Sequence, residues 1–136
     1  MGIGRNFEEA LQKALRMVNE SVDGFDPEIM SLKSRTFWEN ELKDPTDKRI
    51  FVLAAALKDG FSVDELHNMT KIDKWFLNKL RNIIHWHFVL AKEKHELIDK
   101  DLLLQAKQFG FRYAVFDYFW AIIDPTQISA ISNLEN

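Results

Sequence analysis

Apolar residues recur at steps of three and four along much of the chain, most regularly between Thr70 and Ala91. This spacing places them on one side of a long helix, which Asp73 can cap by accepting hydrogen bonds from first-turn amides. Trp75 and Trp86, about three turns apart, mark a second apolar face. Because such a helix must be covered on two sides, we expect it at the centre of the fold. The apolar stripe consists of Phe76, Leu77, Leu80, Ile83, Ile84, Phe88 and Ala91.

A shorter helix is predicted near the start of the chain, with Asn6 as its N-cap and Glu9 as the capping-box partner. Ahead of this helix, Met1–Arg5 is typical of the end of a strand followed by a turn. After it, residues 28–43 have only a weak pattern, and we expect a connector that packs a few aromatic side chains. The expected apolar stripe of the helix consists of Phe7, Ala10, Leu11, Ala14, Leu15 and Val18.

Asp44 followed by Pro45 predicts another helix start, because proline suits the first helical turn. The residues that follow are apolar nearly all round, which indicates a buried helix. Gly60 is expected to end this helix as a left-handed C-cap, with Phe61 packing back over the last turn.

The next helix is predicted to begin after Ser62, with Glu65 as its capping-box partner. Asp99 or Asp101 can open a later helix, and the same glycine–phenylalanine ending returns at Gly110-Phe111. No strand pattern with hairpin signals occurs. The sequence therefore predicts an all-α fold, an irregular bundle of five to seven helices around one long central helix.

The composition limits the class of protein. The chain has 136 residues, of which 46% are apolar and 29% charged, a globular composition for one domain. The net charge of −3 provides no overall field that attracts nucleic acid or an anionic membrane. The absence of cysteine excludes a disulfide scaffold and a thiolate metal site, and it fits the cytoplasmic location that we expect. No signal peptide or membrane span is expected, since the apolar segment 114–123 is short and contains Asp117.

Candidate chemistry is sparse. His85, His87 and His95 could suggest a metal, but on a helix His85 and His87 point about 200° apart and cannot share one ion. We therefore interpret His87 as a hydrogen-bonded core residue. The acidic residues around Asp44 are better explained by capping and solvation than by a carboxylate site. We predict no catalytic, cofactor-binding or metal-ligating residue, and whether the chain alone has enzymatic activity stays open.

The two tryptophans of the long helix have different expected roles. Trp86 is expected in the core. For Trp75, a core position and a position in an interface stay equally open, because tryptophan is common in both.

Residues Phe51–Leu80 also imitate a helix-turn-helix, so nucleic-acid binding is the alternative function. Against it, Asp73 at the start of the second helix would repel phosphate, and the string Trp-Phe-Leu suits burial better than a groove. We therefore expect no nucleic acid among the partners. The cations that could meet phosphates are Lys71, Lys74, Lys79 and Arg81.

Three strings resemble the large subunit of carbamoyl-phosphate synthetases. They are residues 2–16 (Gly-Ile-Gly-Arg-Asn-Phe-Glu-Glu-Ala-Leu-Gln-Lys-Ala-Leu-Arg), residues 44–50 (Asp-Pro-Thr-Asp-Lys-Arg-Ile) and residues 64–77, which contain Thr-x-Ile-Asp-x-Trp-Phe-Leu. The second string is most similar to the eukaryotic trifunctional pyrimidine-synthesis members of the family. The resemblance covers residues 1–111, whereas the aromatic-rich tail 112–136 departs from the family pattern.

The resemblance implies three regions. Residues 1–20 would be the C-terminal edge of an ATP-grasp synthetase domain, residues 21–111 a helical oligomerisation domain, and residues 112–136 a divergent tail. The implied role is a non-catalytic scaffold in a ligase that makes carbamoyl phosphate from bicarbonate, glutamine-derived ammonia and ATP, for pyrimidine or arginine biosynthesis. The ATP and magnesium sites of that parent would lie outside this chain.

The implied partners are the flanking ATP-grasp domains and the glutaminase part of the parent, with no membrane. We also expect self-association through exposed apolar surface. The residues that carry the family motifs, for which a packing role is implied, are Gly4, Arg5, Glu9, Lys13, Ile72, Asp73, Trp75, Phe76 and Leu77.

Overall fold

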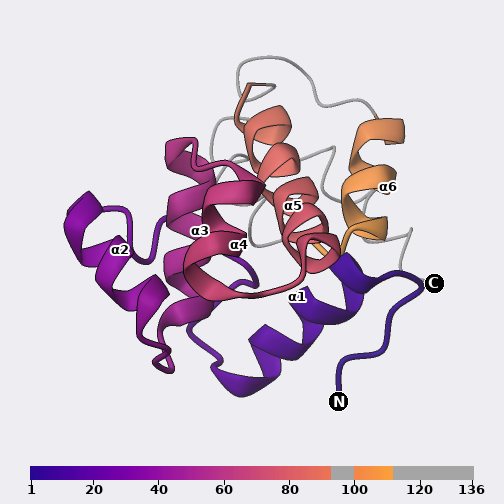
Figure 1. Cartoon of the computed structure of the whole chain (residues 1–136). Helices are drawn as coiled ribbons and strands as arrows, with labels where there is room; N and C mark the ends of the chain where they lie inside the picture. Colours follow the sequence, from indigo (N-terminus) through magenta and orange to yellow (C-terminus); the bar gives the residue numbers. More distant parts are fainter. Residues whose placement is uncertain (93–99, 112–136) are drawn as a thin grey trace.

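The computed structural model describes residues 1–92 and 100–111 of the chain (Figure 1). These residues form six helices and no strand, which confirms the all-α prediction. The expected strand end at Met1–Arg5 is therefore wrong, because this segment is irregular backbone that lies against the first helix. His95, Asp99 and the tail 112–136 lie outside the described residues. The helices are α1 (Phe7–Val18), α2 (Arg35–Lys43), α3 (Arg49–Asp59), α4 (Val63–Thr70), α5 (Lys74–Lys92) and α6 (Lys100–Gln108).

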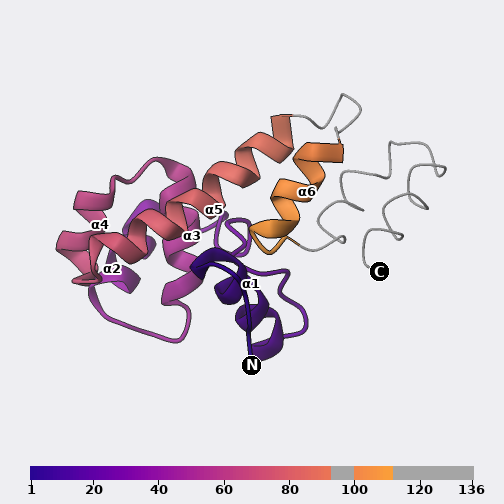
Figure 2. The same ribbon diagram turned by 90° about the vertical axis from the view of Figure 1, so that its right-hand side faces the viewer.

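Helix α5 is the longest helix of the described part of the chain and lies among the others (Figure 2). It packs against α1, α3 and α4, and Trp86 on α5 contacts Phe109 just after α6, with 5.3 Å between ring centroids. Asp73 caps it, since its carboxylate accepts from the Trp75 amide at 2.8 Å. The prediction of one long central helix is confirmed.

The core is built on α3, whose run Val52–Leu57 is buried without interruption. Phe25, from the loop between α1 and α2, is fully enclosed and belongs to the same core cluster. Residues 28–43 form more than a connector, because Arg35–Lys43 is helical and buries Trp38 and Leu42, one turn apart. Ser34 is the N-cap of this helix, because its hydroxyl oxygen accepts from the Phe37 amide at 3.2 Å. The weak apolar pattern of the segment did not predict this cap.

The helix start predicted at Asp44-Pro45 is wrong. Asp44 is the C-cap of α2, and its amide donates to the Asn40 carbonyl at 3.0 Å. Helix α3 begins only at Arg49, whose guanidinium donates to the carbonyls of Leu42 and Thr70 at 3.2 and 2.7 Å. Residues 44–48 therefore form the turn that lets one arginine bind the end of α2 and the end of α4.

Two predicted apolar stripes are only partly buried. On α5, Leu77, Leu80, Ile83 and Ile84 are buried, but Ala91 is exposed and Phe76 and Phe88 are 44% and 50% exposed. On α1, the buried residues are the polar Glu8 and Gln12, while Val18 is 86% exposed. The physical reason is that α1 turns a hydrogen-bonding face, as well as its leucines, toward the rest of the molecule.

Candidate interaction surface

Three aromatic side chains meet at the surface where α1 and α5 begin. Phe7 contacts Trp75 and Phe76 edge-on, with centroids 5.6 and 5.5 Å apart, and Trp75 lies 4.9 Å from Phe76 in a perpendicular arrangement. Trp75 is 53% exposed, so it belongs to the surface rather than to the core. We call these three residues the aromatic patch.

The helix caps position the patch. Phe7 is the first residue of α1 and follows the N-cap Asn6, whose side-chain oxygen accepts from the Glu9 amide at 2.8 Å. Trp75 and Phe76 lie in the first turn of α5, directly after the cap Asp73. Leu77, the next residue, is fully buried and fastens this turn to the core. The patch is therefore presented by two helix starts and not by a loop.

A polar contact underneath joins the two helices. Glu8 is buried, accepts from the Asn82 side chain at 3.1 Å and lies 3.9 Å from the Lys79 ammonium. The same ammonium lies 5.3 Å from the ring centroid of Trp75, within the range of a cation–π contact. Lys79 thus links the patch to the α1–α5 contact.

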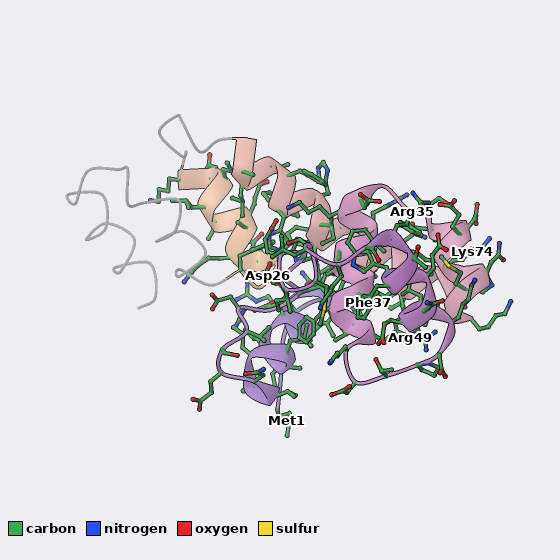
Figure 3. The ribbon with its side chains drawn as sticks, turned by 90° about the vertical axis from the view of Figure 1, so that its left-hand side faces the viewer. Met1, Asp26, Arg35, Phe37, Arg49 and Lys74 are labelled. Atoms are coloured by element: carbon green, nitrogen blue, oxygen red, sulfur yellow. The ribbon has the colours of Figure 1, made fainter. Side chains whose placement is uncertain are left out.

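Two of the cations of the alternative helix-turn-helix, Lys74 and Lys79, lie close to acidic side chains. Lys74 forms an exposed ion pair with Asp64 at 2.7 Å, and it projects at the end of the molecule that α2 and α4 occupy (Figure 3). Hydrogen bonding and the charge of Lys74 lower the pKa of Asp64. Lys71 is the left-handed C-cap of α4. Positive and negative side chains therefore lie beside the aromatic patch at the start of α5.

The N-terminal motif residues come together on α1. Lys13 forms a 2.8 Å ion pair with Glu9 and donates to the Ile3 carbonyl at 3.1 Å. Glu9 accepts from the Arg5 amide at 2.9 Å, instead of from the Asn6 amide as a true capping box would require. The hydrogen bond from Lys13 lowers the pKa of Glu9 most, followed by the bond from Arg5. A Cβ on Gly4 would lie 2.6 Å from the Ala10 amide nitrogen, so only glycine fits there.

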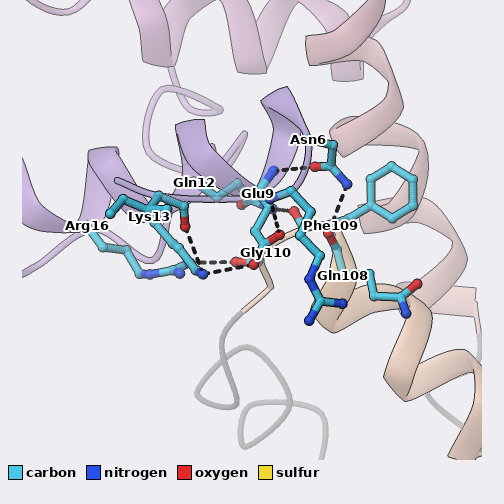
Figure 4. Close-up of polar contacts among 10 residues, drawn as sticks. Asn6, Glu9, Gln12, Lys13, Arg16, Gln108, Phe109 and Gly110 are labelled. Atoms are coloured by element: carbon cyan, nitrogen blue, oxygen red, sulfur yellow. Dashed lines mark hydrogen bonds and ion pairs between the residues drawn. The ribbon is translucent and has the colours of Figure 1, made fainter. Parts of the chain in front are cut away.

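The other face of α1 binds the end of α6 (Figure 4). Asn6, Gln12 and Arg16 donate to the carbonyls of three successive residues at 3.2, 2.8 and 2.7 Å. Gln12 also accepts from the Phe25 amide at 3.3 Å. The bound carbonyls belong to Gln108, Phe109 and Gly110.

The structure thus divides the sequence-predicted site residues into two groups. One group surrounds α1, and the other (Ile72, Asp73, Trp75, Phe76, Leu77) starts α5. Phe7 joins the groups, although its spacing suggested only a core residue. Gln12 and Arg16 were missed too, because polar residues one turn apart on a helix normally indicate a solvated face.

The two histidines of α5, His85 and His87, form no shared site. His87 faces the core, its Nε2 lies 3.0 Å from the Phe25 carbonyl, and its ring meets Phe111 edge-on at 5.0 Å. Burial lowers its pKa, so the ring is neutral near pH 7 and Nε2 carries the donated proton. His85 is exposed. Residues 1–92 and 100–111 contain no group of three potential ligands that could hold a metal ion, and no helix in these ranges is long and apolar enough to cross a membrane.

Comparison with known proteins gives a consistent result. Residues 1–134 match the family described as carbamoyl-phosphate synthetase large chain, oligomerisation domain. The multifunctional protein CAD of Squalus acanthias is 53% identical over 113 residues, which are 82% of this chain and 5% of that protein. The mitochondrial carbamoyl-phosphate synthase [ammonia] of Rattus norvegicus is 43% identical over 114 residues, 82% of this chain and 8% of that protein.

The carbamoyl phosphate synthase large chain of Methanobrevibacter smithii is 44% identical over 110 residues, 81% of this chain and 10% of that protein. This chain therefore spans a tenth or less of the length of these relatives. The comparisons give no support to nucleic-acid binding, and the match includes most of the segment 112–136. The chain belongs to the family of carbamoyl-phosphate synthetase large chain oligomerisation domains.

Proposed function

We propose that this chain is a non-catalytic helical module of a cytoplasmic carbamoyl-phosphate synthetase, which contacts neighbouring domains and further copies of itself through the aromatic patch. The whole protein would make carbamoyl phosphate from bicarbonate, glutamine-derived ammonia and ATP. Its nucleotide and magnesium sites would lie in the ATP-grasp domains that flank this module, and its ammonia would come from a glutaminase part.

The observation that carries this proposal is the exposure of the patch. Trp75 and Phe76 are 53% and 44% exposed, yet they are held by capped helix starts and by their contacts with Phe7. Aromatic residues fixed in this way lose little conformational entropy on binding, and they are enriched in the energetic centres of protein interfaces. The surrounding mixed charges at Lys74, Asp64 and Lys79 fit the polar rim of such an interface.

The patch can be tested by measuring association. We expect the molar mass from light scattering to rise with protein concentration for the unchanged chain. The double substitution Trp75→Ala/Phe76→Ala should weaken association by about tenfold or more, in line with the loss of one hot spot. Phe88→Ala is the matched control, because Phe88 is half-exposed on the same helix but lies outside the patch. A clean monomer at all concentrations would contradict self-association.

Contacts with neighbouring domains need a separate measurement. A purified ATP-grasp synthetase domain should bind the chain in calorimetry, and the same double substitution should reduce the affinity while Phe88→Ala leaves it unchanged. Mg-ATP added to the chain alone should not raise its melting temperature, because only a ligand that binds the native state stabilises it. ATP turnover by the isolated chain would defeat the non-catalytic role.

A further inference from the structure

Helix α1 holds the backbone of the segment that enters the domain, residues 1–5. Lys13 binds the Ile3 carbonyl, and Glu9 binds the Arg5 amide, so two side chains one turn apart fix the segment along the helix. The approach is close, because a Cβ on Gly2 would lie 2.5 Å from the Ala10 carbonyl oxygen. This segment therefore rests directly on the helix backbone.

The same helix holds the backbone of residues 108–111, at the end of α6 and just after it, which we call the outgoing segment. The last carbonyls of a helix and those of the turn that follows have no partner within the helix. Here Asn6, Gln12 and Arg16 supply donors to Gln108, the last residue of α6, and to the two residues after it. The contact is again close, since a Cβ on Gly110 would lie 2.9 Å from the Glu9 Cα. These bonds join residues 94 to 102 positions apart in the sequence, and none of them uses a side chain of α6.

We propose that α1 is a clip that fixes residues 1–5, the incoming segment, and residues 108–111, the outgoing segment, relative to each other. The two segments are bound to one rigid helix, from donors and acceptors spaced over Asn6–Arg16, so neither can shift without breaking hydrogen bonds to α1. The consequence for a larger synthetase rests on the proposed function: regions continuing from the two segments would change orientation together and not independently.

The arrangement of glycines supports the clip. Gly2 and Gly4 on the incoming side and Gly110 on the outgoing side all lie where a Cβ would come within 3 Å of α1 backbone atoms. Gly60, which ends α3 in a similar backbone conformation, has open space at the same position. Close backbone approach is therefore a property of the two clipped segments and not of helix ends in this chain generally.

The clip can be tested by measuring one distance. The chain has no cysteine, so Ile3→Cys and Gln108→Cys introduce two labelling sites, both at exposed side chains. Pulsed electron–electron double resonance on the doubly labelled chain, diluted in excess unlabelled chain, should give one narrow distance distribution. Loosening the clip should widen this distribution about twofold, because segments held by fewer bonds to α1 sample more positions.

Two variants release the clip without removing the caps. Asn6→Asp keeps the oxygen that caps α1 but loses the amide donor to Gln108, and Arg16→Met keeps much of the aliphatic stem but loses the donor to Gly110. Their combination leaves only the Gln12 bond to Phe109 and should loosen the outgoing segment, and Lys13→Met leaves only the Glu9 bond to Arg5 and should loosen the incoming one. Arg35→Met is the matched control and should leave the distribution narrow, because Arg35 lies on α2 and contacts Glu39, Asp59 and Phe61.

The outcomes separate the two proposals. A broad distribution in the unchanged chain, or a narrow one in both the double variant and Lys13→Met, would overturn the clip. If circular dichroism shows that the double variant loses helix, Arg16→Met alone carries the outgoing test. Light scattering on the same samples tests association separately, so a monomer with a narrow distance would defeat the proposed function and leave the clip intact.

Discussion

Two helices in this protein end with the same local structure. Gly60-Phe61 closes α3 and Gly110-Phe111 closes α6. In each, the phenylalanine amide donates five residues back and the glycine amide three residues back, at 3.1 and 3.3 Å for α3 and at 3.2 and 2.9 Å for α6. Both glycines have positive φ, 99° and 85°, and both phenylalanines are buried. These are two copies of the Schellman motif.

Their surroundings differ. Gly60 is exposed, and Phe61 is covered by the Arg35 guanidinium at 4.3 Å from its centroid. Gly110 is buried against α1, its carbonyl accepts from Arg16, and Phe111 meets the His87 ring. The comparison teaches that one sequence signal can end a helix in both places, while only one of the two ends is also a junction between distant segments.

The largest expected effect is shared by both ends. Phe61→Ala and Phe111→Ala should each lower the free energy of unfolding by about 3–5 kcal/mol, because each removes a buried aromatic ring from the core. Urea unfolding followed by circular dichroism measures the difference. A loss at one end only would show that the two clasps are not equivalent.

The next effect should separate the two ends. Gly60→Ala should cost about 1–2 kcal/mol, from the left-handed conformation alone. Gly110→Ala should cost about 1–3 kcal/mol more, because its Cβ would also press against the Glu9 backbone. Asparagine tolerates positive φ, so Gly60→Asn should be nearly neutral and Gly110→Asn still harmful in thermal unfolding. Equal melting temperatures for the two asparagine variants would contradict the close contact at Gly110.

A smaller difference is expected for the two arginines. Arg16→Met removes a charge-assisted hydrogen bond to a buried junction and should cost about 1–2 kcal/mol. Arg35→Met removes an exposed cation–π contact and a weak ion pair and should cost about 0.5–1 kcal/mol. Chemical denaturation of the two single variants gives the comparison directly, and the reverse order would mean that Arg16 is not part of the junction.

The smallest expected effect is a pH dependence confined to the Phe111 end. Burial lowers the pKa of His87, and the hydrogen bond to Phe25 and the charge of Asp26 offset this only in part. The unfolded chain then binds the proton of His87 more readily than the folded chain does. The contribution of His87 to stability is therefore fully present above the ordinary histidine pKa of about 6.5 and is lost as the pH falls below it. His87→Gln should reduce this slope in melting temperatures measured just below pH 7, because the carboxylates whose pKa is lowered, Glu9, Asp64 and Glu65, contribute to the slope only at more acid pH.

Asp26 provides a check on that prediction. Burial raises the pKa of Asp26, so its ionised form weakens the fold, and this loss is relieved as the pH falls through the raised pKa toward the ordinary one. Asp26→Asn removes this opposing contribution together with the charge that favours protonated His87. The decline in stability below neutral pH should therefore become steeper in Asp26→Asn, and a shallower decline would show that His87 is not its source.

Much of the fold could be predicted because helix ends are local. Asn6, Ser62 and Asp73 accept from amides two or three residues ahead, so each cap is visible in a short string. The prediction of a helix start at Asp44-Pro45 failed because a residue that can cap the start of a helix can equally stand at the end of the preceding one. There the tertiary contacts of Arg49 decided the boundary.

The candidate site was less predictable. The motif strings contained Trp75 and Phe76, but their spacing resembled a core stripe, and only the packing of α5 showed them at the surface beside Phe7. Whether residues 1–20 belong to a preceding synthetase domain stays a prediction.

By itself, the sequence determined the helical class, most helix caps, the buried run of α3 and the two glycine–phenylalanine endings. These features depend on hydrogen bonds and periodicities within a few residues. Only the tertiary structure decided that α1 buries Glu8 and Gln12, that Gly110 lies against α1 and that the two helix starts share an aromatic patch. Those contacts join groups far apart in the chain, and their stability depends on geometry that no short string contains.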